Sequence, residues 1–220
     1  TIASETYAAV SGGVTSLCCP ADTNPVIDST AVIKLINLTA ANEGFCHVYP
    51  MAAMTKGLLG QELSEMYTLM KAGCVGVSNA LHPVSNTLVM RRVMEYAASH
   101  QITVFLQPQD PYLSHNGCAH EGQVSSRQGL SGIPESAETI ALLRDIELVK
   151  LTGVKAHICQ ISTARSVEII RQAKKSGLDI SCDVTAHQLF LTEMDIDGFN
   201  SDCHVIPPFR TQRDQDALIN

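Results

Sequence analysis

The chain lacks several features that define whole classes of protein. No stretch approaches the ~20 consecutive apolar residues that a transmembrane helix needs, and no charged-then-apolar leader opens the chain. Acidic residues outnumber basic ones by 22 to 15, and no basic stripe is present to contact phosphates. Neither a membrane nor a nucleic acid is therefore expected as a partner.

Cysteine spacing argues against a second group of functions. The eight cysteines include no Cys-x-x-Cys pair, and Cys18 and Cys19 are adjacent, which is poor geometry for an ordinary disulfide. Most of the eight lie within or beside apolar runs. We therefore expect buried thiols in a reducing cytoplasm, in preference to a metal or disulfide framework.

What the chain does have is a repeating order of apolar strand, loop and helix. Strands are expected at 14–19, 45–49, 74–78, 102–106, 155–159 and 178–184. Helices are expected at 61–72, 86–99 and 135–152, with two more that start after Asp28 or Ser29 and after Ser162 or Thr163. The expected inward side chains of these helices are Val32, Leu35, Ile36, Leu38, Leu63, Met66, Leu69, Met70, Ile140, Leu143, Leu151, Val167, Ile170 and Ala173.

This order without a change of composition predicts parallel β/α units in a single domain over residues 1–220. A doubly wound sheet and a (β/α)₈ barrel both satisfy it. No Gly-x-Gly-x-x-Gly or Walker pattern follows a strand, which removes the main support for an open nucleotide-binding sheet. Six units would leave a barrel open by two, so we expect an incomplete barrel that lacks its first and last strands and is part of a longer chain.

Amide side chains follow three of the expected strands. Asn79, Gln107 and Gln160 occupy the position where a parallel sheet usually presents its chemistry, and none of them carries a charge or an imidazole. Residues 110–135 form a long expected loop, and loops of this length in a compact domain tend to be functional or mobile.

Several segments, in order along the chain, carry a resemblance to a known family. They include Gly12-Gly13-Val14-Thr15-Ser16, Met90-Arg91-Arg92, Asp110-Pro111-Tyr112-Leu113, Val184-Thr185-Ala186-His187 and Pro207-Pro208-Phe209-Arg210. In these the chain resembles the dihydroorotases of the amidohydrolase superfamily. The resemblance implies a (β/α)₈ TIM-type barrel of the metal-dependent hydrolases, in which zinc-activated water attacks a cyclic amide during pyrimidine biosynthesis.

The same resemblance shows where the chain departs from the family. The family motifs His-Cys-Glu-Asp, Cys-His-Val-Ser-Thr and Ser-Asp-Asp-Gly place metal ligands at Gln107, Gln160 and Asn79, so an amide replaces each ligand. On the substrate side, Asp22 and Ile206 stand where the family has asparagine. An Asp22 carboxylate ~4 Å from a substrate carboxylate would cost about 1 kcal/mol in water and about 4 kcal/mol at a dielectric of 20. We therefore expect no catalytic residue and no bound metal at these positions.

Three functions remain open. The first is suggested by resemblance, since the chain resembles the non-catalytic dihydroorotase-like subunits that associate with aspartate carbamoyltransferase, and this resemblance implies an oligomeric cytoplasmic assembly partner. The alternative is an active zinc-dependent dihydroorotase that interconverts N-carbamoyl-aspartate and dihydroorotate, and the third possibility is a barrel that binds another small molecule.

The histidines and several basic residues have more ordinary expected roles. A zinc site rebuilt from His157, Cys159, His187 or His204 is the less favoured reading, because hydrogen-bonded histidines are more common. We expect solvated side chains for His115 and His120, and surface charges for Lys56, Arg91 and Arg92.

Overall fold

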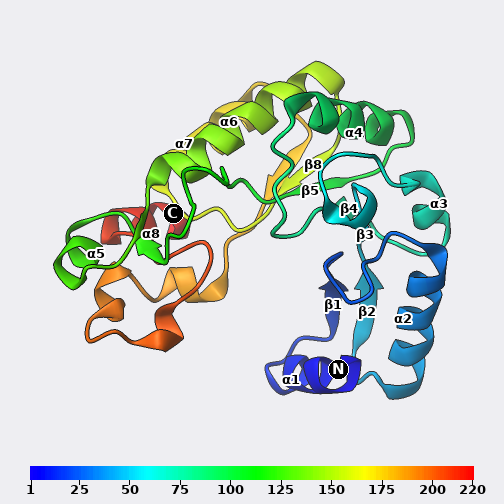
Figure 1. Ribbon diagram of the computed structural model, residues 1–220, viewed down its shortest axis with the longest axis horizontal. Helices are drawn as coiled ribbons and strands as arrows, with labels where there is room; N and C mark the ends of the chain where they lie inside the picture. Colours follow the sequence, from blue (N-terminus) through cyan, green and yellow to red (C-terminus); the bar gives the residue numbers. More distant parts are fainter. The chain divides into compact units, whose positions relative to one another are not determined.

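The computed structural model describes residues 1–220, which divide into two compact units, Thr1–Phe105 and Leu106–Asn220. Figure 1 labels most of the helices and strands of both units and colours the chain along the sequence. Each unit has parallel strands, helices and buried residues of its own. The single domain expected over residues 1–220, without first and last strands, stays a prediction.

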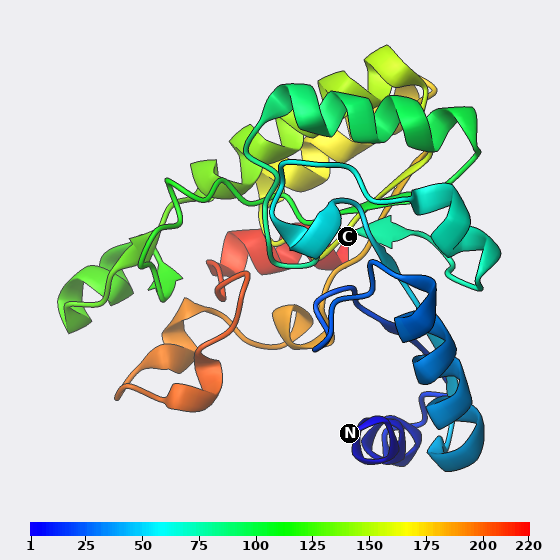
Figure 2. The ribbon, with the colours of Figure 1, turned by 45° about the vertical axis from the view of Figure 1, so that its right-hand side comes forward.

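The first unit is built on parallel strands with helices between them. Its elements are α1 (Ile2–Ser11), β1 (Ser16–Cys19), α2 (Thr30–Glu43), β2 (His47–Pro50), β3 (Ala52–Ala53), the 3₁₀ turn η1 (Lys56–Leu58), α3 (Met66–Lys71), β4 (Val77–Ser78), α4 (Thr87–Ser99) and β5 (Val104–Leu106), whose last residue belongs to the second unit. β1 pairs with β2, and β4 lies between β3 and β5. Both views show α2 alongside β2 (Figures 1 and 2). Ala52 and Val77 have no exposed surface, as expected for parallel strands covered on both faces.

Helix α4 agrees with the expected segment. Asn86 is its N-cap, and the Asn86 side chain accepts hydrogen bonds from the N–H groups of Leu88 and Val89, which the helix itself leaves without partners. Val93 and Met94 are fully buried, so the apolar stripe faces the core.

Two other helices of this unit differ from expectation. α3 begins at Met66 instead of residue 61, because Leu63 forms an antiparallel bridge with Thr55 and the Ser64 N–H donates to Met54 O at 3.0 Å. These backbone bonds hold the preceding residues in an extended conformation. In α2, Leu35 and Leu38 are 57% and 64% exposed, whereas Ile33 and Ile36 are the buried residues.

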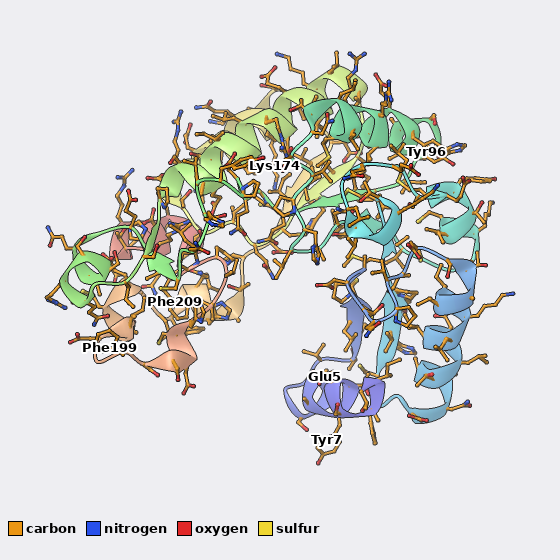
Figure 3. All side chains as sticks on the ribbon, viewed as in Figure 1. Glu5, Tyr7, Tyr96, Lys174, Phe199 and Phe209 are labelled. Carbon is orange, nitrogen blue, oxygen red and sulfur yellow. The ribbon has the colours of Figure 1, made fainter.

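The second unit contains the following elements: β6 (Ala119–His120), α5 (Gln123–Gln128), β7 (Gly132–Ile133), α6 (Glu135–Thr152), β8 (Ala156–Ile158), α7 (Ala164–Lys175), β9 (Ile180–Cys182), the 3₁₀ turns η2 (Ala186–Leu189), η3 (Glu193–Ile196) and η4 (Ser201–Cys203), and α8 (Gln212–Ile219). β8 pairs with β9 in parallel, and α6 packs beside α7 (Figures 1 and 2). The expected long loop is therefore not structureless, because β6, α5 and β7 lie inside it. A small cluster of Ala119, Ile196, Cys203 and Phe209 buries Phe209 completely, whereas Phe199 is exposed (Figure 3).

Helix α6 has the predicted bounds but buries a different face. Ile140, Leu143 and Leu151 were expected to point inward, yet they are 49%, 46% and 61% exposed. The buried residues are Ala137, Glu138, Ala141, Leu142, Asp145, Ile146, Leu148 and Val149. The prediction was wrong because two charged residues lie in the inward stripe, and a search for apolar periodicity discounts such positions.

The cysteines are all free, and their expected burial is wrong for most of them. Only Cys74 and Cys203 are buried, and Cys18 is exposed. Burial raises the pKa of the Cys74 thiol to about 12, which keeps it protonated and inert at neutral pH. No helix of the structure combines the length and the apolar character needed to cross a membrane.

Candidate functional site

Asn79, which follows β4 in the first unit, is a buried amide with all its hydrogen-bonding capacity in use. Its Oδ1 accepts from the N–H of Thr55 at 3.3 Å and from Thr55 Oγ1 at 3.0 Å. Its Nδ2 donates to Leu58 O at 3.2 Å and to His82 O at 3.0 Å. Four bonds match the two acceptor and two donor positions of an amide, so Asn79 holds together the loops that follow β3 and β4.

Gln107 and Gln160 belong to the second unit and line one cavity there. The cavity measures about 10 Å³, room for a single water molecule, and its lining includes Gln109, Glu138 and Arg210. The backbone of Gln160 has a φ of 54°, in the left-handed region that residues other than glycine rarely adopt. The Gln160 N–H donates to Asp183 Oδ1 at 2.6 Å. The structure therefore brings two of the predicted amides to one small cavity.

Glu138, beside that cavity, is the acceptor of a buried hydrogen-bond network. The side chain is 3% exposed, and its carboxylate accepts from both the N–H and the hydroxyl of Ser162 and from both the N–H and the hydroxyl of Thr163. Thr163 is the N-cap of α7 and accepts from the Ser166 N–H at 3.1 Å. A carboxylate at this end of a helix also interacts favourably with the helix dipole.

Arg210 completes the network as a buried cation. It is 3% exposed, and its Nε donates to Ser162 Oγ at 3.0 Å. Its Nη1 lies 2.8 Å from Ile133 O and 3.0 Å from His120 Nδ1. Burial lowers the pKa of Arg210, and the nearby Glu138 carboxylate opposes that shift. The two charges thus compensate one another through the shared Ser162 hydroxyl.

His120 was expected to be solvated, and that expectation is wrong. The ring is half-buried, and a guanidinium can only donate, so Nδ1 accepts from Arg210. Burial and the Arg210 charge lower the pKa of His120, which favours the neutral imidazole. His115 and His204 are exposed, and His187 packs edge-on against Phe209 at 5.3 Å between ring centres.

A second polar cluster joins β8 to β9. His157 Nε2 lies 2.9 Å from Asp183 Oδ2, and His157 Nδ1 lies 2.8 Å from Ser181 Oγ. The hydrogen bond with His157 lowers the pKa of Asp183. One ligand atom each from His157, Cys159 and Asp183 lie within 4.8 Å of one another. This is the set of side chains whose geometry suits a metal ion.

The predicted substrate positions are placed in different units. Asp22 is an exposed residue of the first unit, and Ile206 is a 41% exposed residue of the second. Asn79 also belongs to the first unit, so Gln107 and Gln160 are the two predicted positions that one unit brings together.

The zinc that the family resemblance implies does not fit the side chains at positions 79, 107 and 160. All three are neutral amides, and zinc sites in proteins use thiolate, imidazole and carboxylate ligands. Both polar atoms of the Asn79 side chain already have two partners each. Binding a cation there would break the bonds that hold its loops.

Three residues of these networks were missed by sequence reasoning. Arg210 lies in a segment that carried the family resemblance, but no role was assigned to it or to Glu138. A signal existed for Glu138, since it falls in line with Ala141 and Leu142 on the buried stripe of α6. Asp183 had no such signal, because its partner lies 26 residues away on the neighbouring strand.

Comparison with solved structures defines the fold class. The L-hydantoinase (dihydropyrimidinase) from Arthrobacter aurescens matches with a TM-score of 0.83 at 17% identity, over 99% of this chain and 50% of that one. The D-hydantoinase (dihydropyrimidinase) from Thermus sp. matches with a TM-score of 0.77 at 15% identity, over 99% and 50%. Likeness at this identity shows the fold alone, which is an α/β barrel that is present here in part. The expected fold class is therefore confirmed.

Comparison of sequences then defines the family. The dihydro-orotase-like family matches residues 1–166, more than half of the chain, so the chain belongs to that family. A dihydroorotase-like protein of Pseudomonas aeruginosa is 47% identical over 217 residues, which cover 99% of this chain and 51% of that protein. A dihydroorotase of Caldanaerobacter subterraneus is 40% identical over 219 residues, covering 100% and 51%. The chain spans about half the length of the curated relatives it matches.

Proposed function

We propose that this chain is part of a catalytically silent dihydroorotase-like protein of pyrimidine biosynthesis, which serves in the cytoplasm as an assembly partner of aspartate carbamoyltransferase. One observation carries the proposal. At Asn79, Gln107 and Gln160, where the family resemblance places metal ligands, the chain has neutral amides, and the amide of Asn79 is fully hydrogen-bonded.

The chemistry of the family explains why these amides matter. A zinc hydrolase needs the metal to lower the pKa of its bound water from 15.7 to about 7 and to polarise the carbonyl under attack. Amide oxygens carry no charge to balance the cation, and they are weaker donors than imidazole or carboxylate. Without a metal tightly held at these three positions, the family's active site has no means to generate hydroxide near neutral pH.

The partner is inferred from the resemblance to non-catalytic subunits that associate with aspartate carbamoyltransferase. In keeping with this, the relatives from Pseudomonas aeruginosa and Pseudomonas putida, at 47% and 48% identity, are named dihydroorotase-like proteins. A silent subunit of this kind contributes a surface instead of an active site.

A second candidate function is an active zinc-dependent dihydroorotase. It is favoured by the relatives at 40% and 41% identity that are named dihydroorotases. In this alternative, metal ligands from the rest of the full-length protein would have to hold zinc without positions 79, 107 and 160.

The full-length protein tests the choice directly. With zinc supplied, we expect no hydrolysis of dihydroorotate and no cyclisation of N-carbamoyl-aspartate above buffer, and a turnover of about 1 per second or more would overturn the proposal. Gln107→His should gain no zinc, because Gln160 and Asn79 remain amides. Zinc content should also be unchanged in Gln107→Ala and Gln160→Ala, whereas loss of a zinc equivalent in either variant would favour the active enzyme.

The partner requires a separate measurement. Mixed with aspartate carbamoyltransferase from the same organism, the full-length protein should co-elute with it in size-exclusion chromatography. Separate elution of the two proteins at micromolar concentration would refute the assembly role and leave the catalytic conclusion to the hydrolysis assay.

A further inference from the structure

The polar cluster on β8 and β9 has the layout of a metal site. His157 and Cys159 lie two residues apart and alternate with the buried Ala156 and Ile158, so both point to the face of the sheet opposite the core side chains. His157 pairs in register with Ser181, and the same register brings Asp183, two residues further on, beside Cys159. Parallel pairing thus gathers an imidazole, a thiol and a carboxylate at adjacent strand ends.

The non-ligating atoms of two of these side chains are held in place. His157 Nδ1 lies 2.8 Å from Ser181 Oγ, and Asp183 Oδ1 accepts the N–H of Gln160 at 2.6 Å. His157 Nε2 and Asp183 Oδ2 then face one another at 2.9 Å. Metal-bound histidines and carboxylates are oriented in this way by hydrogen bonds from an outer shell of residues.

We propose that His157, Cys159 and Asp183 bind a divalent metal ion, with zinc preferred, at a position separate from the family positions 79, 107 and 160. One nitrogen, one sulfur and one oxygen ligand form a set that zinc favours, with water in the fourth position. A thiolate and a carboxylate together balance the charge of the ion. The half-exposed Asp183 leaves the ion a path from solvent.

Binding at this site requires only proton release and a small movement. The Cys159 thiol loses its proton to solvent. The proton between His157 Nε2 and Asp183 Oδ2 moves to His157 Nδ1, which then donates to Ser181 Oγ, so Nε2 binds the metal as part of a neutral imidazole with no change of oxidation state. Ligand atoms bound at 2.0–2.1 Å in a tetrahedron lie about 3.4 Å apart. Nε2 and Oδ2 therefore have to separate by roughly half an ångström, and Cys159 Sγ, which lies within 4.8 Å of them, has to approach by up to about 1 Å. Side-chain rotation can supply both movements.

Cobalt(II) is the probe that reports the thiolate ligand. Titrated into chelator-stripped full-length protein, it should bind one equivalent with a thiolate-to-cobalt charge-transfer band, and zinc should displace it. The band should be absent in Cys159→Ser. It should remain in the control Cys182→Ser, since Cys182 lies next to Asp183 on the neighbouring strand but on its opposite face.

Two further variants distinguish the loss of a metal ligand from the loss of the fold. His157→Gln and Asp183→Asn keep the thiol, and each should weaken zinc binding at least tenfold, because even an outer-shell change costs about 10- to 100-fold. Their circular dichroism and melting temperature should show that they are folded. Absence of the thiolate band in the unsubstituted protein, or equal zinc affinity in all variants, would overturn the proposal and leave a His157–Asp183 hydrogen bond only.

A metal here is compatible with either function proposed above, because none of its ligands is at position 79, 107 or 160. The proposed metal site and the proposed lack of catalysis can therefore be refuted independently. Zinc lost with Cys159→Ser but not with Gln107→Ala belongs to this site, whereas hydrolysis of dihydroorotate tests the catalytic conclusion alone.

Discussion

Replacing Glu138 by glutamine should destabilise the protein strongly, although the two side chains have nearly the same shape. Glu138 accepts hydrogen bonds from four donors, the N–H and hydroxyl groups of Ser162 and Thr163, at a residue that is 3% exposed. A glutamine amide at this position would offer one acceptor oxygen, and its NH₂ group would face a donor. The substitution would also remove the negative charge that compensates the buried Arg210.

The expected magnitude follows from the strength of these bonds. A hydrogen bond to a charged group contributes about 1.5–3 kcal/mol, and a neutral one about 0.5–1.5 kcal/mol. Weakening three or four of them, with partial relaxation, should cost about 3 kcal/mol. That is a large part of a typical stability of about 5–15 kcal/mol.

Urea unfolding of the full-length protein, followed by circular dichroism, measures this cost. With a slope of about 2 kcal/mol per molar, the midpoint should fall by about 1.5 M. Glu147→Gln is the matched control, because Glu147 lies exposed on the same helix, and its effect should be within about 0.5 kcal/mol. Equal midpoints for the two variants would show that the network contributes no net stability.

The pairing with Arg210 adds a second check on the same reasoning. Arg210→Met should also destabilise, because it leaves the Glu138 carboxylate without its cation. The double variant should lose clearly less stability than the sum of the two single variants, because it no longer contains an uncompensated buried charge. Strict additivity would refute the proposed compensation through Ser162.

Two further predictions concern α6. Burial raises the pKa of Asp145 to about 6 from its ordinary 3.8, although the Arg144 guanidinium opposes the shift. Ionisation of Asp145 therefore lowers the stability of the fold as the pH rises from about 4 to about 6, and the full cost is present above pH 6. Asp145→Asn should therefore raise stability at pH 7 by at most about 3 kcal/mol, because the weaker bonds from Arg144 offset part of the gain, and the gain should shrink towards pH 4 in urea unfolding. A gain that grew on acidification would contradict this sign. Leu142→Ala, at a side chain with no exposed surface, should cost about 2–5 kcal/mol, whereas Leu143→Ala, at 46% exposure, should cost less than about 1 kcal/mol. Equal urea midpoints for these two variants would show that the buried face of α6 is assigned wrongly.

The bounds of regular elements were the most predictable part of the fold. α6 matches its expected residues, and α4 begins one residue after the expected start and ends at the expected residue. These signals are local, since helical spacing and capping residues act within a turn or two. The start of α3 was mispredicted because residues before Met66 make backbone bonds to the segment after β3, and local periodicity contains no information about such pairing.

In the candidate sites, too, local features could be predicted and contacts between distant residues could not. The amides at positions 79, 107 and 160 could be read directly, because they follow strands. Their partners could not, and the four bonds of Asn79 involve residues as far away as Thr55. His157 and Cys159 were visible as neighbours on one strand face, but Asp183 joined them only through the register of β8 and β9.

The sequence by itself determined the order of parallel β/α elements, the absence of ionisable groups at three strand ends and the family that the chain resembles. Each of these properties depends only on residue types and on short-range spacing along the chain. Only the tertiary structure decided which face of α6 is buried, which donors surround Glu138 and which carboxylate meets His157. Those outcomes depend on contacts between distant segments, and the free energy of burying a charge is set by the partners that the fold supplies.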